Sequence, residues 1–413
     1  MERYSSYKDN GEKWLGEIPG HWEFKKVKHL YTMQTGFTPN TKVPEFYSDS
    51  NDNVWVNISD MKTKNISDSE SHISNLYIKQ FKPSIVPKGS LLYSFKLSVG
   101  EVAFANTDLY TNEAIVSFLP SKNIDLRFLY YSAPLCIIKN ANENIYGAKI
   151  LNQHLIKNAL IVFPPLPEQR AIVEYLDKVT SDIDRAITQS QRMIDLLNER
   201  KQIIIQHAVT KGLNPNAKLK QSGVEWIGEV PEEWKVRKLR YLCKIKTGDK
   251  DTIMRVEDGE YPFFVRSPKI ERINSYTFDT EAILMAGDGA GAGRIFHYYK
   301  GKFGCHQRVY CLHNFSLDVY PQFLYYQLSH FFKEVFLGVS AKSTVDSVRL
   351  PMLKDFQIVF PSVSEQQLIV DHIEKTFEPI SQAIASTERK IALLRERKQI
   401  IINEVVTGKV KVS

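Results

Sequence analysis

The chain has 413 residues, enough for two or three domains, and its 24% charged and 43% hydrophobic residues are typical of a globular protein. No apolar run approaches the roughly 20 residues that cross a bilayer, and the N-terminal segment lacks the apolar core of a signal peptide. We therefore expect a cytoplasmic protein that does not contact a membrane. Four scattered cysteines are more typical of reduced thiols than of a disulfide framework: Cys136, Cys243, Cys305 and Cys311.

The net charge of +7 suggests a polyanionic partner, but the charge is unevenly distributed. Residues 37–163 carry 12 basic and 11 acidic residues, and residues 249–360 carry 13 of each. Residues 213–248 carry eight basic residues against four acidic ones. A basic run is also typical of a solvated surface, so charge alone favours nucleic-acid binding only modestly.

The chain is internally duplicated. The seven residues Glu199–Ile205 return unchanged as Glu396–Ile402, which indicates a repeat. An N-terminal clip segment, residues 1–36, also returns as residues 213–248, with a Trp-x-Gly-Glu-x-Pro motif at Trp14–Pro19 and Trp226–Pro231. Glycine and proline mark a turn there, and the alternation after it predicts a short strand or one helical turn. We expect the clip tryptophans to pack into a core, and its lysines and arginines are candidates for phosphate contact.

Each clip precedes a mixed block, residues 37–163 and residues 249–360. Both blocks show strand-like runs, then a helix, then a closing strand, so they are predicted to be diverged copies. The predicted strands of the first block are Val54–Ile58, Ser90–Phe95, Ala114–Leu119 and Leu160–Phe163, with a helix around Leu126–Ile138. Those of the second block are Ala282–Ala286 before a glycine turn, Arg308–Leu312 and Ile358–Phe360, with a helix from Phe323.

A long helix is predicted after each block, in residues 164–212 and 361–413. Apolar residues recur with a heptad period, which predicts a coiled coil in which the two helices pair antiparallel. The seam positions are Leu176, Ile183, Leu197 and Ile204 in the first helix and Ile373, Ile380, Leu394 and Ile401 in the second. Pro379 should kink the second helix or delay its start. The predicted fold is thus mixed α/β, with two pseudo-twofold-related domains separated by two long antiparallel coiled-coil helices.

The order of clip, variable block and long helix, repeated twice, resembles the specificity subunit of a type I restriction-modification system. The resemblance also rests on Pro165-Leu-Pro-Glu-Gln169 and on the repeated Glu-Arg-Lys-Gln-Ile-Ile helix ends, and it covers nearly all of residues 11–408. It implies that each block is a target-recognition domain reading one half of a gapped, asymmetric DNA site. The helices would set the gap and dock two methyltransferase subunits, and restriction subunits would complete the complex.

Basic and polar residues in the two blocks are candidates for DNA contact. Arginine reads guanine with two hydrogen bonds, asparagine reads adenine, and lysine mostly contacts the backbone. An exposed, solvated side chain is the alternative at each position. The candidates are Trp55 and Asn57 on a strand, Lys96 in the turn before Gly100, Lys149 in a loop, Arg266, Arg294 at the end of the glycine turn, and Lys342.

The polar residues of the repeated helix ends are the candidates for contact with the methyltransferase subunits. A pseudo-twofold scaffold presents the same helix end twice and can therefore recruit the same partner twice. The alternative is that these residues only pack the two helices together. The eight residues are Glu199, Arg200, Lys201, Gln202, Glu396, Arg397, Lys398 and Gln399.

The sequence shows little sign of catalytic chemistry. The turn Gly287–Gly293 lacks the ending of a Walker loop and the spacing of a dinucleotide fingerprint, so we interpret it as a tight turn close to DNA. Cys305, His306, Cys311 and His313 do not match the spacing of a zinc site. We expect a non-catalytic subunit without a cofactor or metal of its own, with S-adenosylmethionine, ATP and Mg²⁺ bound by its partners. Two alternatives stay open: a two-headed protein-binding scaffold without DNA specificity, and a methyltransferase fragment that uses the glycine turn.

Overall fold

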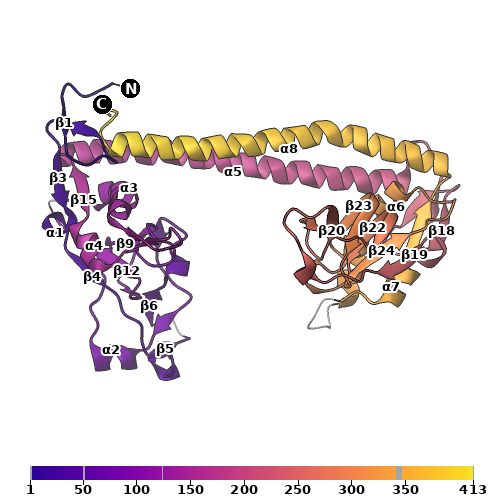
Figure 1. Cartoon of the computed structure of the whole chain (residues 1–413), viewed down its shortest axis with the longest axis horizontal. Helices are drawn as coiled ribbons and strands as arrows, with labels where there is room; N and C mark the ends of the chain where they lie inside the picture. Colours follow the sequence, from indigo (N-terminus) through magenta and orange to yellow (C-terminus); the bar gives the residue numbers. More distant parts are fainter. Residues whose placement is uncertain (1, 50–51, 123, 341–346, 413) are drawn as a thin grey trace. The chain divides into compact units, whose positions relative to one another are not determined.

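The computed structural model describes residues 2–49, 52–122, 124–340 and 347–412. The chain divides into two units (Figure 1). Unit 1 contains Met1–Thr188 and Lys390–Ser413, and unit 2 contains Gln189–Arg389. Each unit therefore combines one α/β domain with a part of both long helices.

The domain of unit 1 is built around two larger sheets. The larger sheet has the strand order β4-β12-β9-β10-β7, and the smaller has the order β11-β6-β8-β5. β12 pairs antiparallel with both β4 and β9, whereas β10 pairs in parallel with β7. The strands are β4 (Met33–Thr35), β5 (Tyr47–Ser48), β6 (Asn53–Val56), β7 (Asn65–Ile66), β8 (His72–Ile73), β9 (Leu91–Ser94), β10 (Val102–Ala105), β11 (Tyr110–Thr111) and β12 (Ile115–Phe118).

Helix α3 (Leu126–Cys136) closes the main core of this domain. Asp125 caps its first turn by accepting a hydrogen bond of 2.9 Å from the backbone N–H of Arg127. Phe128 and Leu129 on its inner face are fully buried with Phe118. The other elements of the domain are the short helices α2 (Asn75–Phe81) and α4 (Gln153–Asn158), the 3-10 turns η1 (Pro44–Phe46), η2 (Ile58–Asp60) and η3 (Ile137–Asn140), and the hairpin of β13 (Asn142–Glu143) and β14 (Lys149–Ile150).

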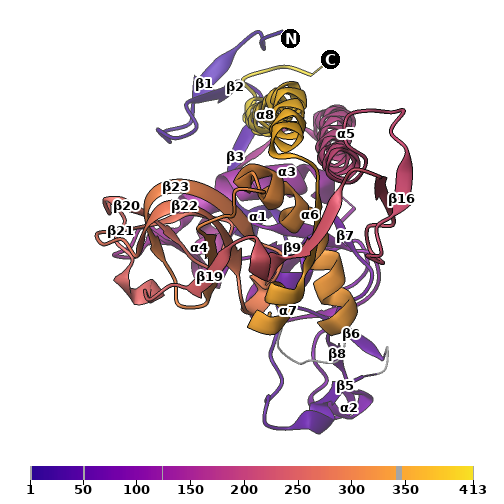
Figure 2. The same ribbon diagram turned by 90° about the vertical axis from the view of Figure 1, so that its right-hand side faces the viewer.

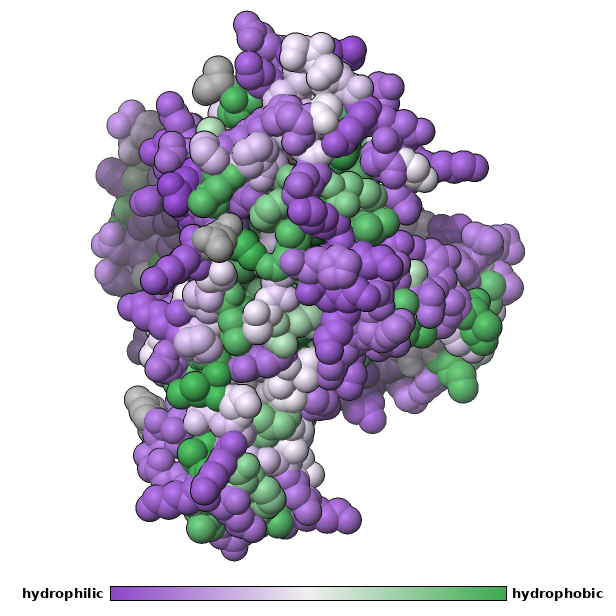
Figure 3. Space-filling view, turned by 90° about the vertical axis from the view of Figure 1, so that its left-hand side faces the viewer, coloured by the Kyte–Doolittle hydropathy of each residue, from purple (hydrophilic) through white to green (hydrophobic). Residues whose placement is uncertain are grey.

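Hydrophilic side chains cover most of the surface of the molecule seen from the side of unit 1, and apolar side chains form small groups between them (Figure 3). Leu76 and Phe81 on α2 are among the exposed apolar residues, each about half exposed.

The domain of unit 2 is built around one six-stranded sheet with the order β19-β24-β22-β23-β20-β21. The pair β22 and β23 is much longer than the corresponding pair β9 and β10 in unit 1. The strands are β19 (Lys244–Thr247), β20 (Tyr261–Phe264), β21 (Glu271–Ile273), β22 (Phe278–Ala286), β23 (Phe296–Cys305) and β24 (Val309–His313). Helix α6 (Pro321–Ser340) packs on the sheet, and the short helix α7 (Leu350–Asp355) follows it. The 3-10 turns of this unit are η4 (Leu239–Tyr241), η5 (Thr252–Met254) and η6 (Gly289–Gly291).

The predicted duplication is confirmed by matching backbone hydrogen bonds. Gly36 N–H donates to the Ile115 carbonyl at 3.4 Å, and Gly248 N–H donates to the Val309 carbonyl at 3.3 Å. A Cβ atom on either glycine would lie 1.9 Å from a carbonyl oxygen of the neighbouring strand, so both positions require glycine. The Thr-Gly pairs of the sequence repeat therefore mark the same close strand crossing in both domains.

Each clip forms a hairpin followed by a strand that pairs with the closing strand of its domain. The hairpins are β1 (Tyr7–Asp9) with β2 (Glu17–Pro19), and β16 (Leu219–Gln221) with β17 (Glu229–Pro231). The strand pairs are β3 (Glu23–Lys26) with β15 (Leu160–Phe163), and β18 (Lys235–Lys238) with β25 (Gln357–Phe360). Of the clip tryptophans, which were predicted to pack into a core, Trp22 and Trp234 are buried, whereas Trp14 and Trp226 are only partly buried. The helical turn α1 (Val27–Leu30) follows β3.

The long helices are α5 (Leu166–Lys211) and α8 (Val363–Val406), which lie side by side (Figures 1 and 2). In unit 1 the Nζ of Lys398 lies 2.7 Å from both carboxylate oxygens of Asp184, and in unit 2 the Nζ of Lys201 lies 2.6 Å from Ser381 Oγ. The beginning of each helix thus faces the end of the other, which confirms the antiparallel pairing. α8 runs through Pro379, so the idea that this helix starts late is wrong.

The buried seam of the helices follows the predicted period but differs in detail. Leu176 and Ile183 are buried, whereas Leu197 and Ile204 are only partly buried, and the flanking Ile194 is buried instead. Ser190 also lies in the seam, 7% exposed. In α8 the corresponding isoleucines 373, 380 and 391 are buried and Leu394 is partly buried.

Both chain termini lie in unit 1. The backbone N–H of Lys411 donates to the carbonyl of Glu2 at 2.9 Å, and Gly408, at the end of α8, packs against Trp22 of the first clip. In unit 2 the corresponding Gly212, at the end of α5, packs against Trp234 of the second clip. Each helix end therefore packs against a clip in the same way. The second clip follows α5 directly in the sequence, whereas the first clip, against which α8 packs, lies at the other end of the chain.

Candidate nucleic-acid interface

The candidate Trp55 lies in β6 and is only 6% exposed. Its Nε1 donates to the carbonyl of Phe37 at 3.0 Å, and its ring packs against Tyr47 with ring centroids 5.9 Å apart. A buried side chain that is hydrogen-bonded and packed against another ring can hold the neighbouring loop in place. It cannot reach a base without leaving the core.

Asn57 follows Trp55 and caps the turn η2. Its backbone N–H donates to Asp60 at 2.7 Å, and its side-chain oxygen accepts a bond of 3.2 Å from Asn112. The side chain is half-buried. Asn57 therefore joins the β6 loop to the segment that precedes β12.

Lys96 lies two residues after the end of β9, and its side chain is 52% exposed. Its Nζ is 3.9 Å from Glu113, which also accepts a hydrogen bond from Thr38. The hydrogen bond from the Thr38 hydroxyl lowers the pKa of Glu113 below its ordinary value, and the charge of Lys96 adds to this effect. Lys149 lies on the separate hairpin β13–β14, where it forms an ion pair with Glu143.

In the second domain, Arg266 follows β20 and Arg308 precedes β24. Their Nη1 atoms lie 2.8 and 2.7 Å from the two carboxylate oxygens of Asp288, which belongs to the glycine turn after β22. The two arginine side chains are 39% and 58% exposed, and the carboxylate between them is 18% exposed. Arg308 and Asp288 were not among the residues predicted from the sequence to contact DNA. The signal available was that Arg308 begins a predicted strand beside the turn that contains Asp288.

The remaining candidates of the second domain are Arg294 and Lys342. Arg294 is exposed, and its Nη1 lies 3.4 Å from the carbonyl of Ala290 in the same turn. Lys342 lies outside the described residues.

The sheet end that carries Lys96 in the first domain is matched by the one that carries Asp288 and Arg308 in the second. Phe95 N–H donates to the Ala114 carbonyl at 3.0 Å, and Gly287 N–H donates to the Arg308 carbonyl at 2.9 Å. These bonds place Lys96 beside Glu113 in one domain and Asp288 beside Arg308 in the other. The backbone frame is therefore shared, whereas the charged side chains on it differ.

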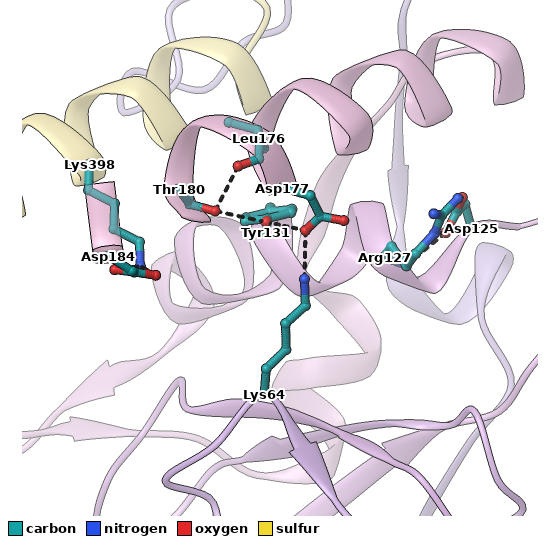
Figure 4. A network of polar contacts seen from close by, with 9 residues as sticks. All are labelled: Lys64, Asp125, Arg127, Tyr131, Leu176, Asp177, Thr180, Asp184 and Lys398. Carbon is teal, nitrogen blue, oxygen red and sulfur yellow. Dashed lines mark hydrogen bonds and ion pairs between the residues drawn. The ribbon is translucent and has the colours of Figure 1, made fainter. Parts of the chain in front are cut away.

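A polar network anchors the first domain to α5 (Figure 4). Asp177 of α5 accepts hydrogen bonds of 2.6 Å from both the Tyr131 hydroxyl and the Nζ of Lys64. Burial opposes ionisation of Asp177, but these two donors outweigh it and keep the pKa of its carboxyl below the ordinary value. Thr180 lies 3.4 Å from the same hydroxyl. The domain is thus held on the helix by charged hydrogen bonds as well as by apolar packing.

The repeated helix ends have the same burial pattern in both copies. Glu199, Arg200 and Gln202 are exposed, and so are Glu396, Arg397 and Gln399. Lys201 and Lys398 are half-buried and contact the facing helix, as described above, and Gln202 also lies 3.0 Å from His330. The apolar residues Leu196, Ile203, Leu393 and Ile400 remain 52%, 57%, 64% and 47% exposed.

In the part of the chain that the structure describes, no group of three or more His, Cys, Asp or Glu side chains is arranged to hold a metal ion. Among the same residues, no helix is both long and apolar enough to cross a membrane.

Comparisons with known proteins agree with this duplicated architecture. The family of the type I restriction modification DNA specificity domain matches residues 19–191 and 231–394. The MjaIX specificity subunit of Methanocaldococcus jannaschii is 21% identical, over 96% of this chain and 95% of its own length. The EcoDI specificity subunit of Escherichia coli is 30% identical over 44% of this chain. The matched region covers 39% of the EcoDI subunit.

The fold is also similar to that of a chain solved in a study of complex assembly and conformational transition of the type I R-M system. That chain has a TM-score of 0.65 and 16% identity, with 95% of this chain and 99% of the other covered. The family match covers both α/β domains and most of both long helices. The chain therefore belongs to the type I restriction-modification DNA specificity family.

Proposed function

We propose that this chain is the DNA-recognition subunit of a type I restriction-modification complex, in which each α/β domain reads one half of a gapped, asymmetric site. One observation carries the proposal: the same sheet end occurs in both domains with different polar side chains on it. A shared frame with different side chains is the arrangement expected of two readers with different base preferences.

The long helices would set the gap between the half-sites. α5 contains 46 residues, which corresponds to about 69 Å at 1.5 Å per residue. A continuous helix is stiff, so its length fixes a distance along the DNA.

The repeated helix faces would each dock one methyltransferase subunit. Leu196 and Ile203 lie two helical turns apart, and Leu393 and Ile400 repeat the arrangement, with the exposed Arg200 and Arg397 between them. Exposed apolar residues flanked by charges are typical of a protein contact. The chain itself would not be catalytic: the methyltransferase subunits would bind S-adenosylmethionine, and restriction subunits would use ATP and Mg²⁺.

The test is co-expression of this chain with its methyltransferase partner in a host without other type I systems, followed by long-read mapping of methylated adenines. We expect a gapped, asymmetric motif. Exchange of residues 37–163 for the same block of a relative should change one half of the motif and leave the other half unchanged. A complex that assembles but adds no methylation would contradict the proposal and favour a protein-binding scaffold.

A further inference from the structure

The most strongly built polar cluster on the sheet end of the second domain is centred on Asp288. One of its carboxylate oxygens accepts a hydrogen bond from Arg266 at 2.8 Å, and the other accepts one from Arg308 at 2.7 Å. The two arginines come from segments far apart in the sequence and are brought together by the parallel pairing of β20 with β23 and the antiparallel pairing of β22 with β24. The cluster is therefore a product of the fold and not of local sequence.

The glycine turn is shaped to allow this arrangement. A Cβ atom on Gly287 would lie 2.9 Å from the carbonyl oxygen of Arg308, and one on Gly291 would lie 2.7 Å from the carbonyl oxygen of Arg266. Larger residues at these two positions would push away the segments that carry the arginines. Gly289 has a φ of +71° and lies beside the guanidinium of Arg266. The glycines thus let Asp288 approach both arginines at once.

The electrostatics keep the cluster charged. Burial opposes ionisation of Asp288, but hydrogen bonds from Arg308 and Arg266 outweigh it and hold the pKa of the carboxyl below its ordinary value. Two guanidinium groups and one carboxylate leave a net charge of +1 at this end of the sheet, where both arginine side chains are partly exposed. Each guanidinium has five N–H donors, so one contact with Asp288 fixes its orientation and still leaves donors that can point outward.

We propose that Arg266 and Arg308 read guanine in the half-site of the second domain, and that Asp288 is the positioning residue that orients both. The proposal rests on the proposed DNA-recognition function and names the residues and the base. A guanidinium matches the O6 and N7 acceptors of guanine with two parallel hydrogen bonds. An arginine held by a carboxylate has already lost side-chain freedom, so it forms these bonds at a lower entropic cost.

The first domain differs at the same place. There Lys96 faces Glu113, and the residue at the position of Arg308 is Ala114. A lysine paired with a glutamate lacks the planar donor pair with which an arginine matches O6 and N7 of guanine. The two half-sites therefore differ at the base pairs that face this sheet end.

The experiment uses the complete complex of this chain with its methyltransferase partner. The variants are Arg308→Ala, Arg266→Ala, Arg308→Lys and Asp288→Asn, and the readouts are the methylated motif and the affinity for duplexes that carry each base in turn. The matched control is Arg255→Ala. Arg255 is 61% exposed and pairs with Glu271, which is 18% exposed, so the control removes a similar surface ion pair at 3.6 Å elsewhere in the same domain.

Arg308→Ala and Arg266→Ala should each lower the preference for guanine by about tenfold or more at one position in the second half-site. The first half-site and the control should be unchanged. Arg308→Lys keeps the charge and should still relax the same position. Asp288→Asn should retain both arginines and lower the preference at both positions together, which a merely structural role would not do.

Three results would overturn the inference. The motif could stay unchanged in both alanine variants of a complex that assembles. Affinity could fall equally for all duplexes, which indicates phosphate contact instead of base reading. The control could relax the same positions. Since the wild-type complex in the same experiment reports whether the chain directs methylation at all, failure of the proposed function is distinguished from failure of this assignment.

Discussion

Asp177 shows how a single carboxylate links a recognition domain to its helix. It accepts a hydrogen bond from the buried Tyr131 hydroxyl and pairs with Lys64, whose Nζ also lies 5.1 Å from the centroid of the Tyr130 ring. A hydrogen bond to a charged group is worth about 1.5–3 kcal/mol, and partial exposure of Asp177 reduces this value.

We predict that Asp177→Asn lowers the free energy of unfolding of unit 1 by about 1–2 kcal/mol at pH 7. The pKa of Asp177 is lowered in the folded state, so its contribution is present above the ordinary value of about 3.9 and is lost as the pH falls through the lowered value. Hydrogen exchange of α3 and of the first half of α5 measures the change, and the difference from wild type should disappear in acid.

The matched control is Glu374→Gln, at the corresponding position of α8. Glu374 accepts a longer hydrogen bond of 3.3 Å from Gln322. We expect a smaller change in exchange of unit 2. Equal effects of the two substitutions would show that the ion pair with Lys64 does not stabilise the domain.

At the level of single residues, the sequence predicted positions better than roles. It correctly placed Trp55 on a strand, but alternation cannot tell which face of a short strand will be covered, and an aromatic cluster with Ile73, Tyr77 and Tyr110 buries this ring. The arginine pair at Asp288 was missed because it depends on contacts between residues that are 20 and 22 positions apart in the sequence.

The ends of the long helices illustrate how elements are joined. Gly408 has a φ of +73°, and a Cβ atom there would lie 2.4 Å from the Pro19 ring; Gly212 has a φ of +71°, and its nearest neighbour would be the flexible Glu365 side chain at 3.2 Å. The left-handed conformation alone costs an alanine about 1–2 kcal/mol.

We predict that Gly408→Ala destabilises unit 1 by about 2–4 kcal/mol, because the rigid proline adds overpacking to the backbone cost. Gly212→Ala should cost unit 2 only about 1–2 kcal/mol, since Glu365 can move aside. Limited proteolysis of each variant, with cleavage at the two clips measured by mass spectrometry, tests whether Gly408→Ala is the more destabilising substitution. A larger effect at Gly212 would contradict it.

At the level of elements, much of the fold follows from local pattern. The heptad period predicted both helices, and the runs at 90–95, 114–119 and 160–163 predicted strands β9, β12 and β15. The strand predicted at 282–286 is the second half of β22, but the rest of the hairpin of β22 and β23 was not predicted, because it lacks a regular alternation of apolar residues. Pro379 shows the same limit, since tertiary packing of α8 outweighs the helix-breaking tendency of one residue.

At the scale of the whole molecule, the duplicated units differ in their histidines. Burial lowers the pKa of His297, His306, His313 and His330, all of which lie in unit 2. A histidine that stays neutral when folded binds fewer protons than the same residue in the unfolded chain. The stability that depends on it is therefore present above pH 6.5 and is lost as the pH falls below that value.

We predict that unit 2 loses stability as the pH falls below about 6.5, by at most about 1.4 kcal/mol per histidine for each pH unit. Hydrogen exchange at matched chemical exchange rates reports unit 2 and unit 1 separately. The variant with His297→Gln and His313→Gln should show a weaker pH dependence in unit 2. A loss of protection confined to unit 1 would contradict the prediction.

The duplication also predicts a stoichiometry for partner binding. Ile203 and Ile400 occupy equivalent positions, are 57% and 47% exposed, and lie next to the same four polar residues in each copy. An aspartate at either position would bury an unpaired charge in the proposed contact, which costs several kcal/mol. Because each unit carries one copy, each substitution should remove one methyltransferase subunit and not both.

We therefore expect wild type to bind two methyltransferase subunits, Ile203→Asp or Ile400→Asp to bind one, and the double variant to bind none, as measured by light scattering of the purified complexes. Leu317→Asp is the control, since Leu317 is 98% exposed and lies in the second domain away from the repeated sequence. Retention of two subunits by the double variant would place the contact elsewhere. Loss of both subunits from a single variant would mean that they bind as a unit, and that the pseudo-twofold helix faces do not act as independent sites.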